Sequence, residues 1–343
     1  MYRFLRLCFK AIASNFKILK EPYKLTFAIT YKCNSKCKTC KIWEKKTKNE
    51  LKIDEIKNIF KNINPSWVNL TGGEPFIRND LYDIAEIISK KNAYLLNITT
   101  NGLLVKETIT TLKKILELKI PKIILVVSLD GPKETHDRIR GVKGNWDKAI
   151  CLFTKLKELS SNNKRFQTYL GYTISHYNIG LINKTLEEVN KKIKVNINDF
   201  HFNILHNSFY YGNESIATTI NMKNKIIEDV DCILQQKTGF GIINILEKKY
   251  LKLIKKYFEI EKSPKSCKAL ISSCFIDPSG YVYPCTGFNL IIGNLKAYNY
   301  ELKKIWQSEK ANNARKLINE NVCGGCWSPC EAYQTILGNI LRK

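Results

Sequence analysis

The chain has 343 residues, of which 44% are hydrophobic and 25% charged. This length fits one large domain with a smaller one, and the composition excludes a disordered or collagen-like chain. No secretory signal is visible, and the longest uncharged apolar runs fall far short of the roughly 20 residues that cross a bilayer. Twelve cysteines therefore predict metal binding in a reducing cytoplasm, not a disulfide scaffold.

The formal net charge is +25, from 56 Lys and Arg against 31 Asp and Glu. Such a charge attracts nucleic acid or an anionic membrane. The lysines are scattered over predicted helices, however, in a chain that is also rich in Asn and Ile. A nucleic-acid partner is thus an alternative that the charge alone does not favour.

Residues 1–23 are expected to form a basic amphipathic helix. Arg3, Arg6, Lys10 and Lys17 would share one stripe, with apolar residues away from it. Two interpretations stay open: a helix packed on the main domain, or a helix at a membrane surface that makes the protein peripheral to the membrane.

Short apolar runs alternate with amphipathic stretches from residue 24 to about residue 205. The expected strands are 24–30, 67–71, 95–100, 123–130, 168–174 and 199–205, and helical patterns include 53–63, 80–91 and 145–160. We interpret the strands as nearly continuous apolar runs, which predicts a parallel α/β sheet, open or barrel-like. In such sheets chemistry gathers at the carboxyl ends of the strands.

The remainder of the chain divides into two parts. Residues 215–262 are Lys-rich and predicted to be a helical connector, whereas 263–343 contain a hairpin signal at Asp277–Gly280 and six cysteines between 267 and 330. The expected domains are therefore 1–23, 24–214, 215–262 and a cysteine-rich metal module at 263–343.

The sequence YKCNSKCKTCKIW at 31–43 places Cys33, Cys37 and Cys40 directly after the first expected strand. Cubane clusters and zinc sites take four protein ligands when closed, yet no fourth Cys or His is near. An open coordination position, or zinc with a remote fourth ligand, would explain this spacing.

Four further motifs follow later strands in order: TGGEP (71–75), TTNGLL (99–104), VSLDGPKETHDRIRG (127–141) and GYTISHYN (171–178). Together with the triplet they resemble the radical SAM superfamily. This resemblance implies a partial (β/α)6 TIM-like barrel in which three thiolates hold a [4Fe-4S] cluster. The open iron would bind S-adenosylmethionine (SAM), which is cleaved to a 5′-deoxyadenosyl radical.

The same resemblance implies a set of SAM-contacting residues: Gly72, Gly73, Glu74, Asn101, Ser128, Asp130, Arg140 and Ser175. One departure is Thr39, since many members place an aromatic residue before the third cysteine. Trp43 is near enough in sequence to substitute for it.

The C-terminal cysteines resemble the SPASM and twitch extensions of that superfamily. Cys267 is followed by twelve residues, Gly280, four residues and Cys285, and the chain then has only Cys323, Cys326 and Cys330. The resemblance implies a small α+β module with one auxiliary [4Fe-4S] cluster. Its expected ligands are Cys267, Cys285, Cys323 and Cys326, with Cys330 and Cys274 as alternates and structural zinc as the alternative metal.

A radical SAM oxidoreductase-type enzyme acting on a small molecule, sugar or peptide is the expected function, with flavodoxin or ferredoxin as reductant. Thr286 stands where sulfatase-maturing relatives carry an acidic base, so that activity is disfavoured. The alternatives are an RNA-modifying radical SAM enzyme and a non-enzymatic iron–sulfur or zinc protein that binds nucleic acid. Cys8, Cys151 and Cys232 are expected to be inert, and His201 and His206 to lie near the barrel mouth.

Overall fold

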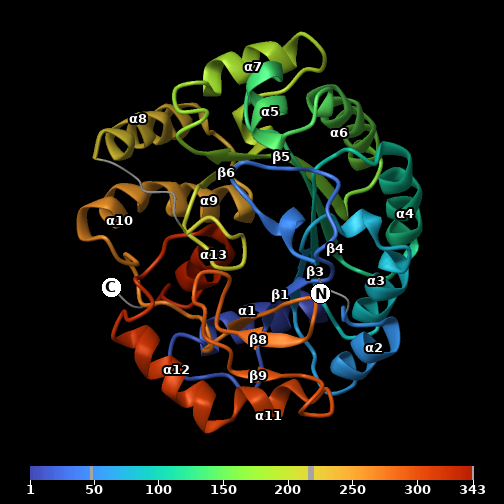
Figure 1. Ribbon diagram of the computed structural model, residues 1–343, viewed down its shortest axis with the longest axis vertical. Coiled ribbons are helices and arrows are strands. Elements are labelled where there is room, and N and C mark those ends of the chain that lie inside the picture. The colour runs from blue at the N-terminus through green and yellow to red at the C-terminus, as the bar shows by residue number, and fades with distance from the viewer. Residues whose placement is uncertain (47–48, 215–219, 342–343) are drawn as a thin grey trace.

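The computed structural model describes residues 1–46, 49–214 and 220–341. Six parallel strands curve around a central space, and helices cover their outer side (Figure 1). The strands are β1 (Lys24–Ala28), β2 (Trp67–Thr71), β3 (Leu95–Thr100), β4 (Lys122–Ser128), β5 (Phe166–Ile174) and β6 (Phe200–Ile204). The expected strands are confirmed, with ends that differ by no more than two residues.

Helices follow each strand of this partial (β/α)6 barrel. Their bounds are α2 (Ile53–Lys61), α3 (Leu81–Ser89), α4 (Val105–Glu117), α5 (Lys133–Arg140), α6 (Asn145–Ser161) and α7 (Ile182–Asn190), followed by α8 (Ile220–Gln236), α9 (Ile242–Lys252) and α10 (Ile254–Ile260). The last three belong to the expected helical connector, whose residues 215–219 lie outside the described residues.

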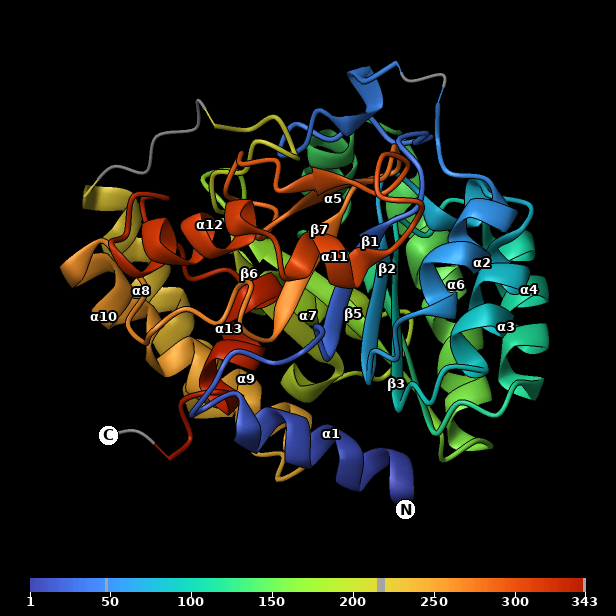
Figure 2. The same ribbon diagram turned by 90° about the horizontal axis from the view of Figure 1, so that it is seen from below.

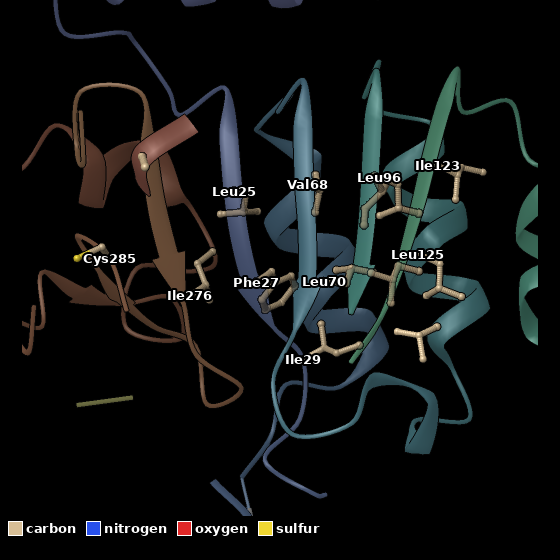
Figure 3. Close-up of a cluster of buried hydrophobic side chains, with 14 of the residues drawn as sticks. Leu25, Phe27, Ile29, Val68, Leu70, Leu96, Ile123, Leu125, Ile276 and Cys285 are labelled. Atoms are coloured by element: carbon tan, nitrogen blue, oxygen red, sulfur yellow. The ribbon is translucent and has the colours of Figure 1, made fainter. Parts of the chain in front are cut away.

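The core lies between the sheet and its outer helices. Leu25 and Phe27 of β1, Leu70 of β2 and Leu125 of β4 point to the helix side (Figure 3), and all are fully buried. Burial of this surface supplies the main stabilisation of the fold.

The other face of the sheet corrects the expectation of nearly continuous apolar strands. Burial alternates residue by residue along β2, β3, β5 and β6. The half-buried positions include polar side chains such as Asn69, Asn97, Gln167 and Asn203, which face the central space. The barrel is therefore hollow, since period-two alternation means that only one face packs against a core.

The cysteine-rich segment continues the barrel sheet. Strand β7 (Ser273–Ile276) pairs in parallel with β1, then β8 (Tyr281–Tyr283) and β9 (Gly293–Asn294) extend it antiparallel, in the order β6-β5-β4-β3-β2-β1-β7-β8-β9. Helices α11 (Leu302–Trp306), α12 (Glu309–Asn319) and α13 (Pro329–Leu337) complete the segment.

Helix α1 (Tyr2–Ala13) lies across the amino-terminal ends of the strands, at the lower end of Figure 2. Its cations face the barrel: the Arg3 guanidinium donates to the carbonyls of Ala93 and Lys119, at 3.2 and 2.7 Å. Lys10 Nζ lies 2.9 Å from Glu21 Oε1. The helix is shorter than the expected 1–23, since it ends at Ala13 and Lys17 lies beyond it. It packs on the main domain both through these cations and through the apolar side chains of Leu7 and Ala11.

Among the described residues, no helix combines the length and the apolar character that crossing a bilayer requires.

Candidate functional site

A cavity of about 810 Å³ fills the interior of the barrel. Its upper end, at the carboxyl ends of the strands, is lined by Cys33, Cys37 and Cys40, and its lower end by α1. The loop after β1 thus carries the cysteine triplet into the space where chemistry is expected in such folds.

Two neighbouring segments hold the cysteine loop by backbone contacts. Lys36 N and Lys38 N donate to the carbonyls of Arg140 and Ile139 at the end of α5, at 3.0 and 2.8 Å. On the other side, a Cβ at Gly73 would lie 2.2 Å from the Lys32 carbonyl oxygen. Only glycine permits so close an approach, which explains the GG pair of the TGGEP motif.

The three thiols form one group, in which Cys37 is buried and Cys33 and Cys40 are partly buried. Burial, with a smaller contribution from neighbouring cysteines of the triplet, raises the pKa of Cys33 to about 11 and that of Cys40 to about 12. Arg140 Nη1 donates to Cys37 Sγ at 3.7 Å, and Asn101 Nδ2 donates to Cys33 Sγ at 3.8 Å. Three thiols at one end of the cavity, with a guanidinium beside Cys37 to offset thiolate charge, fit a cluster held by three thiolates.

Within the described parts of the chain, no three His, Cys, Asp or Glu side chains meet around a point that would hold one metal ion. A cubane cluster takes one thiolate per iron and is suited to thiols that surround a larger space.

Most of the expected SAM-contacting residues come together beside the triplet. Gly72, Gly73, Asn101, Ser128, Asp130 and Arg140 line the same cavity. Asp130 and Arg140 pair with each other, with Oδ2 and Nη2 2.6 Å apart.

Glu74 and Ser175 lie outside the cavity lining. The Glu74 carboxylate is buried and accepts from Asn101 N at 2.7 Å and from Thr100 Oγ1 at 3.0 Å, while burial raises its pKa to about 7. Ser175 lies in a turn, where its backbone N and its hydroxyl both contact Asn178 Oδ1. Glu74 thus ties two loops together, and Ser175 orders the turn after β5.

The second cysteine set forms another group, in which Cys285 is buried and Cys267, Cys323 and Cys326 are partly buried. Burial, with smaller contributions from Glu331, Cys323 and Cys330, raises the pKa of Cys326 to about 12. Burial also raises the pKa values of Cys267 and Cys285, and Cys326 adds to both. Cys285 lies on the far side of β7 from β2 and β3 (Figure 3).

The two alternate cysteines differ in their surroundings. Cys274 is fully buried in the hydrophobic core on β7. Cys330, in the first turn of α13, lines the central cavity together with Tyr211. Its backbone carbonyl accepts a hydrogen bond from Lys24 Nζ, a fully buried amine that also donates to Gln334 Oε1 at 2.7 Å.

Sequence reasoning missed the loop after β6, which covers the cysteine loop. Lys41 N donates to the Tyr211 carbonyl at 2.7 Å, and Asn213 Nδ2 donates to the Thr39 carbonyl at 3.1 Å. The sequence did contain a signal for this loop, because a loop that follows a barrel strand lies at the carboxyl end, where the cysteine loop also lies. Trp43 borders the cavity near the triplet, and His201 and His206 line it as expected.

Comparison with known protein families agrees with this geometry. Residues 27–189 match the model of the radical SAM superfamily, and 267–327 match the model of the SPASM iron–sulfur cluster-binding domain. The second match contains the four expected auxiliary ligands and ends before Cys330.

Similar proteins include an AdoMet-dependent heme synthase of Methanosarcina barkeri, which is 24% identical over 92% of this chain and 90% of its own length. The subtilosin biosynthesis protein AlbA of Bacillus subtilis is also 24% identical, over 89% of this chain and 67% of its own.

Among solved structures, Streptococcus suis SuiB bound to SAM superposes with a TM-score of 0.63 at 18% identity, over 88% of this chain and 69% of SuiB. The structure of anSMEcpe with AdoMet gives 0.60 at 17% identity, over 93% and 97% of the two chains. These likenesses show the fold.

The family assignment removes the non-enzymatic alternative and identifies SAM and iron–sulfur clusters as the cofactors. A hollow β/α barrel with a cysteine triplet after its first strand, followed by a second cysteine set, thus identifies the chain as a radical SAM enzyme of the branch that carries a SPASM iron–sulfur domain.

Proposed function

We propose that this enzyme carries out oxidoreductase-type radical chemistry on a substrate held in the central cavity, between the cysteine triplet and the first turn of α13. One observation carries the proposal: the cavity is lined at its upper end by Cys33, Cys37 and Cys40, and at its side by Cys330. When bound, the triplet's cluster and SAM supply a 5′-deoxyadenosyl radical that takes a hydrogen atom from the substrate.

The residues near the triplet have separate roles in this proposal. Cys33, Cys37 and Cys40 hold the cluster, while Gly72, Gly73, Asn101 and Ser128 bind and orient SAM. Asp130 holds Arg140, whose guanidinium lies beside Cys37 and offsets the negative charge that thiolates carry when a cluster is bound.

The auxiliary site is assigned to Cys267, Cys285, Cys323 and Cys326, with a single cluster. The match of residues 267–327 to the SPASM domain, which contains all four cysteines, supports this set. Cys330 is assigned to the cavity wall because it borders the space where the substrate would lie. The auxiliary cluster would accept an electron from the substrate radical or help to position the substrate.

The domain division is proposed as 1–23, 24–214, 215–262 and 263–343, with the last unit continuing the barrel sheet through β7. Electron supply is proposed to come from a small reductant such as flavodoxin or ferredoxin. We place the enzyme in the cytoplasm, peripheral to a membrane through α1. We do not propose an RNA substrate, because the described cavity lining does not present a row of cations for phosphates.

The test is 5′-deoxyadenosine formation by the reconstituted enzyme with SAM and a strong reductant. Wild type should form the product, and Cys37→Ala should not. Cys151→Ala, which removes an exposed thiol on α6, is the matched control and should retain activity. Product formation by Cys37→Ala at the wild-type rate would contradict the assignment of the triplet.

A further inference from the structure

The lower half of the cavity has a different chemistry from the upper half. Below the polar side chains of β2, β3 and β5, it is lined mostly by apolar groups: Phe4, Leu7, Cys8, Ala11, Trp67 and Leu95. Lys122 is the cation among the residues described there. An apolar tunnel of this kind accommodates an alkyl chain and offers no set of cations for a polycarboxylate.

Polar groups without partners lie on the cavity wall. Gln167 Oε1, Asn244 Oδ1 and His206 Nε2 are buried atoms that make no hydrogen bond to any residue the structure describes. Buried polar atoms are normally paired, so these atoms await a ligand or water. Gln167, near the start of β5, and Asn244, in the first turn of α9, belong to the lower half of the cavity, whereas His206 follows β6 at the upper end. The two amide oxygens suit an uncharged hydrogen-bond donor, such as a hydroxyl or an amide.

The cavity lining includes residues of α1 and, at the start of α9, Gly241, Ile242 and Asn244. Ile242 is also 60% exposed, which indicates that the cavity opens to the surface at this place. In Figure 2 the same end of the barrel is crossed by α1. A molecule could therefore enter at the end opposite the cysteine triplet.

The rim of this mouth is apolar on its outer side. Phe9 of α1 is 72% exposed and Phe240, just before α9, is 90% exposed; the other large exposed side chains here are Leu5, Ile12, Phe16, Ile245, Ile340 and Leu341. The C-terminal residues belong to the same rim, since Leu341 N donates to Asn15 Oδ1. A helix that turns Arg3 and Lys10 inward while its apolar residues Leu5, Phe9 and Ile12 stay exposed is suited to a lipid surface.

The charge around the rim is complementary to such a surface. Lys17, Lys20 and Lys119 are exposed beside the ends of α1. Exposed lysines flanking apolar side chains favour anionic lipid, because they attract the negative headgroups.

We propose that the substrate is a lipid with a long alkyl chain and an uncharged polar group, taken from an anionic lipid surface through the mouth between α1 and α9. The chain would lie along Leu7, Cys8, Trp67 and Leu95, and its polar group beside Gln167 and Asn244, below the SAM site. This inference rests on the proposed function, because it names the substrate class of the same cavity.

The first test is binding of 1-monomyristoylglycerol to the reconstituted enzyme by titration calorimetry. Cys8→Trp fills the lower cavity and should weaken binding about tenfold or more. Cys151→Trp, on the exposed side of α6, should bind as wild type does. Leu95→Phe, a smaller change in the same wall, serves if Cys8→Trp does not fold. No binding to wild type, or equal binding to all variants, would overturn the inference.

The second test is co-sedimentation with vesicles of phosphatidylcholine and phosphatidylglycerol. Phe9→Glu should abolish binding, whereas Ile220→Glu, at an exposed site at the start of α8 away from α1 (Figure 2), should not. Equal sedimentation of both variants would overturn entry from a lipid surface.

Both tests are paired with 5′-deoxyadenosine formation in the same preparations. Radical formation without lipid binding contradicts the substrate class alone. Lipid binding without radical formation contradicts the proposed function alone.

Discussion

Arg140 reaches Cys37 from the end of α5: its Nη1 lies 3.7 Å from the Cys37 sulfur, while Nη2 lies 2.6 Å from Asp130 Oδ2. Burial by itself would lower the pKa of Arg140, but Asp130 and Cys37 outweigh this effect and raise it. The guanidinium is thus a fixed cation beside the cluster site.

Removing Asp130 should leave that cation unpaired. Breaking a buried ion pair from one side costs about 3–5 kcal/mol, so Asp130→Ala should lower the free energy of unfolding by roughly that amount. Urea unfolding measures this. The matched control is Asp147→Ala, which breaks the half-exposed ion pair of Asp147 on α6 with Lys133 on α5. It should lower the free energy of unfolding by under about 1 kcal/mol. Equal losses would show that the Asp130–Arg140 pair is not effectively buried.

Gly73→Ala should displace the cysteine loop. The added Cβ would lie 2.2 Å from the Lys32 carbonyl oxygen and 2.8 Å from that of Tyr31. A backbone shift next to Cys33 should cost about 3 kcal/mol and reduce iron bound by the triplet. Iron analysis and thermal unfolding check both effects. Gly241→Ala is the control, because the Cβ position there faces open space, and it should change neither stability nor bound iron. If Gly241→Ala lowered stability as much as Gly73→Ala, the loss would come from backbone propensity and not from steric contact.

Glu247→Gln should destabilise the join between β6 and α9. The fully buried carboxylate lies 2.9 Å from Lys237 Nζ and 3.2 Å from His201 Nδ1, and its Oε1 accepts from Phe202 N at 2.7 Å. Removing the carboxylate charge from this buried ion-pair network should lower the free energy of unfolding by about 3–5 kcal/mol, measured by urea unfolding at neutral pH. Glu86→Gln, in an exposed pair with Lys90, is the control and should cost under about 1 kcal/mol.

The same network has a pH signature. Burial alone would raise the pKa of Glu247, but His201 and Lys237 outweigh it and hold the pKa below its ordinary value. The stabilisation is therefore fully present above the unfolded-state pKa of about 4.3 and is lost as pH falls through the lower folded-state pKa. Stability curves of wild type and Glu247→Gln should approach each other below about pH 4. A constant gap down to pH 3 would exclude this linkage.

Cys326→Ala should lose the auxiliary cluster, whereas Cys330→Ala should retain it and lose substrate turnover instead. The reason is that Cys326 lies within the matched iron–sulfur domain and Cys330 lines the central cavity. Iron content and electron paramagnetic resonance of the reduced protein distinguish the two variants. Cys274→Ala, in the hydrophobic core, controls for loss of a buried thiol. Loss of iron in Cys330→Ala would make Cys330 a ligand.

The sequence predicted the strands well because each is a short apolar run between turn residues, and β2 and β3 match to the residue. The hollow interior was missed although the signal was present. In WVNLT and LLNITT, polar residues recur at every second position, and this alternation indicates one face without a packed core.

Two other features of the fold could not be predicted from local sequence patterns. The pairing of β7 with β1 joins Ser273 to Lys24, and no local pattern identifies partners so far apart in the chain. The direction of α1 depends on free carbonyls at Ala93 and Lys119, which exist only once α3 and α4 have ended nearby. Amphipathicity predicts that a helix has two faces, not which one the protein covers.

The contact between β1 and β7 constrains the order in which parts of this enzyme can fold during synthesis. Strand β1 needs β7 as its neighbour, and Lys24 at its start is enclosed by the carbonyl of Cys330 and the side chain of Gln334. A ribosome releases Cys330 and Gln334 only after about 300 further residues have been made, so β1 completes its surroundings only when α13, the last described helix, is available. The cysteine loop after β1 therefore reaches its final surroundings late in synthesis, and iron is expected to bind there after β7 and α13 have folded.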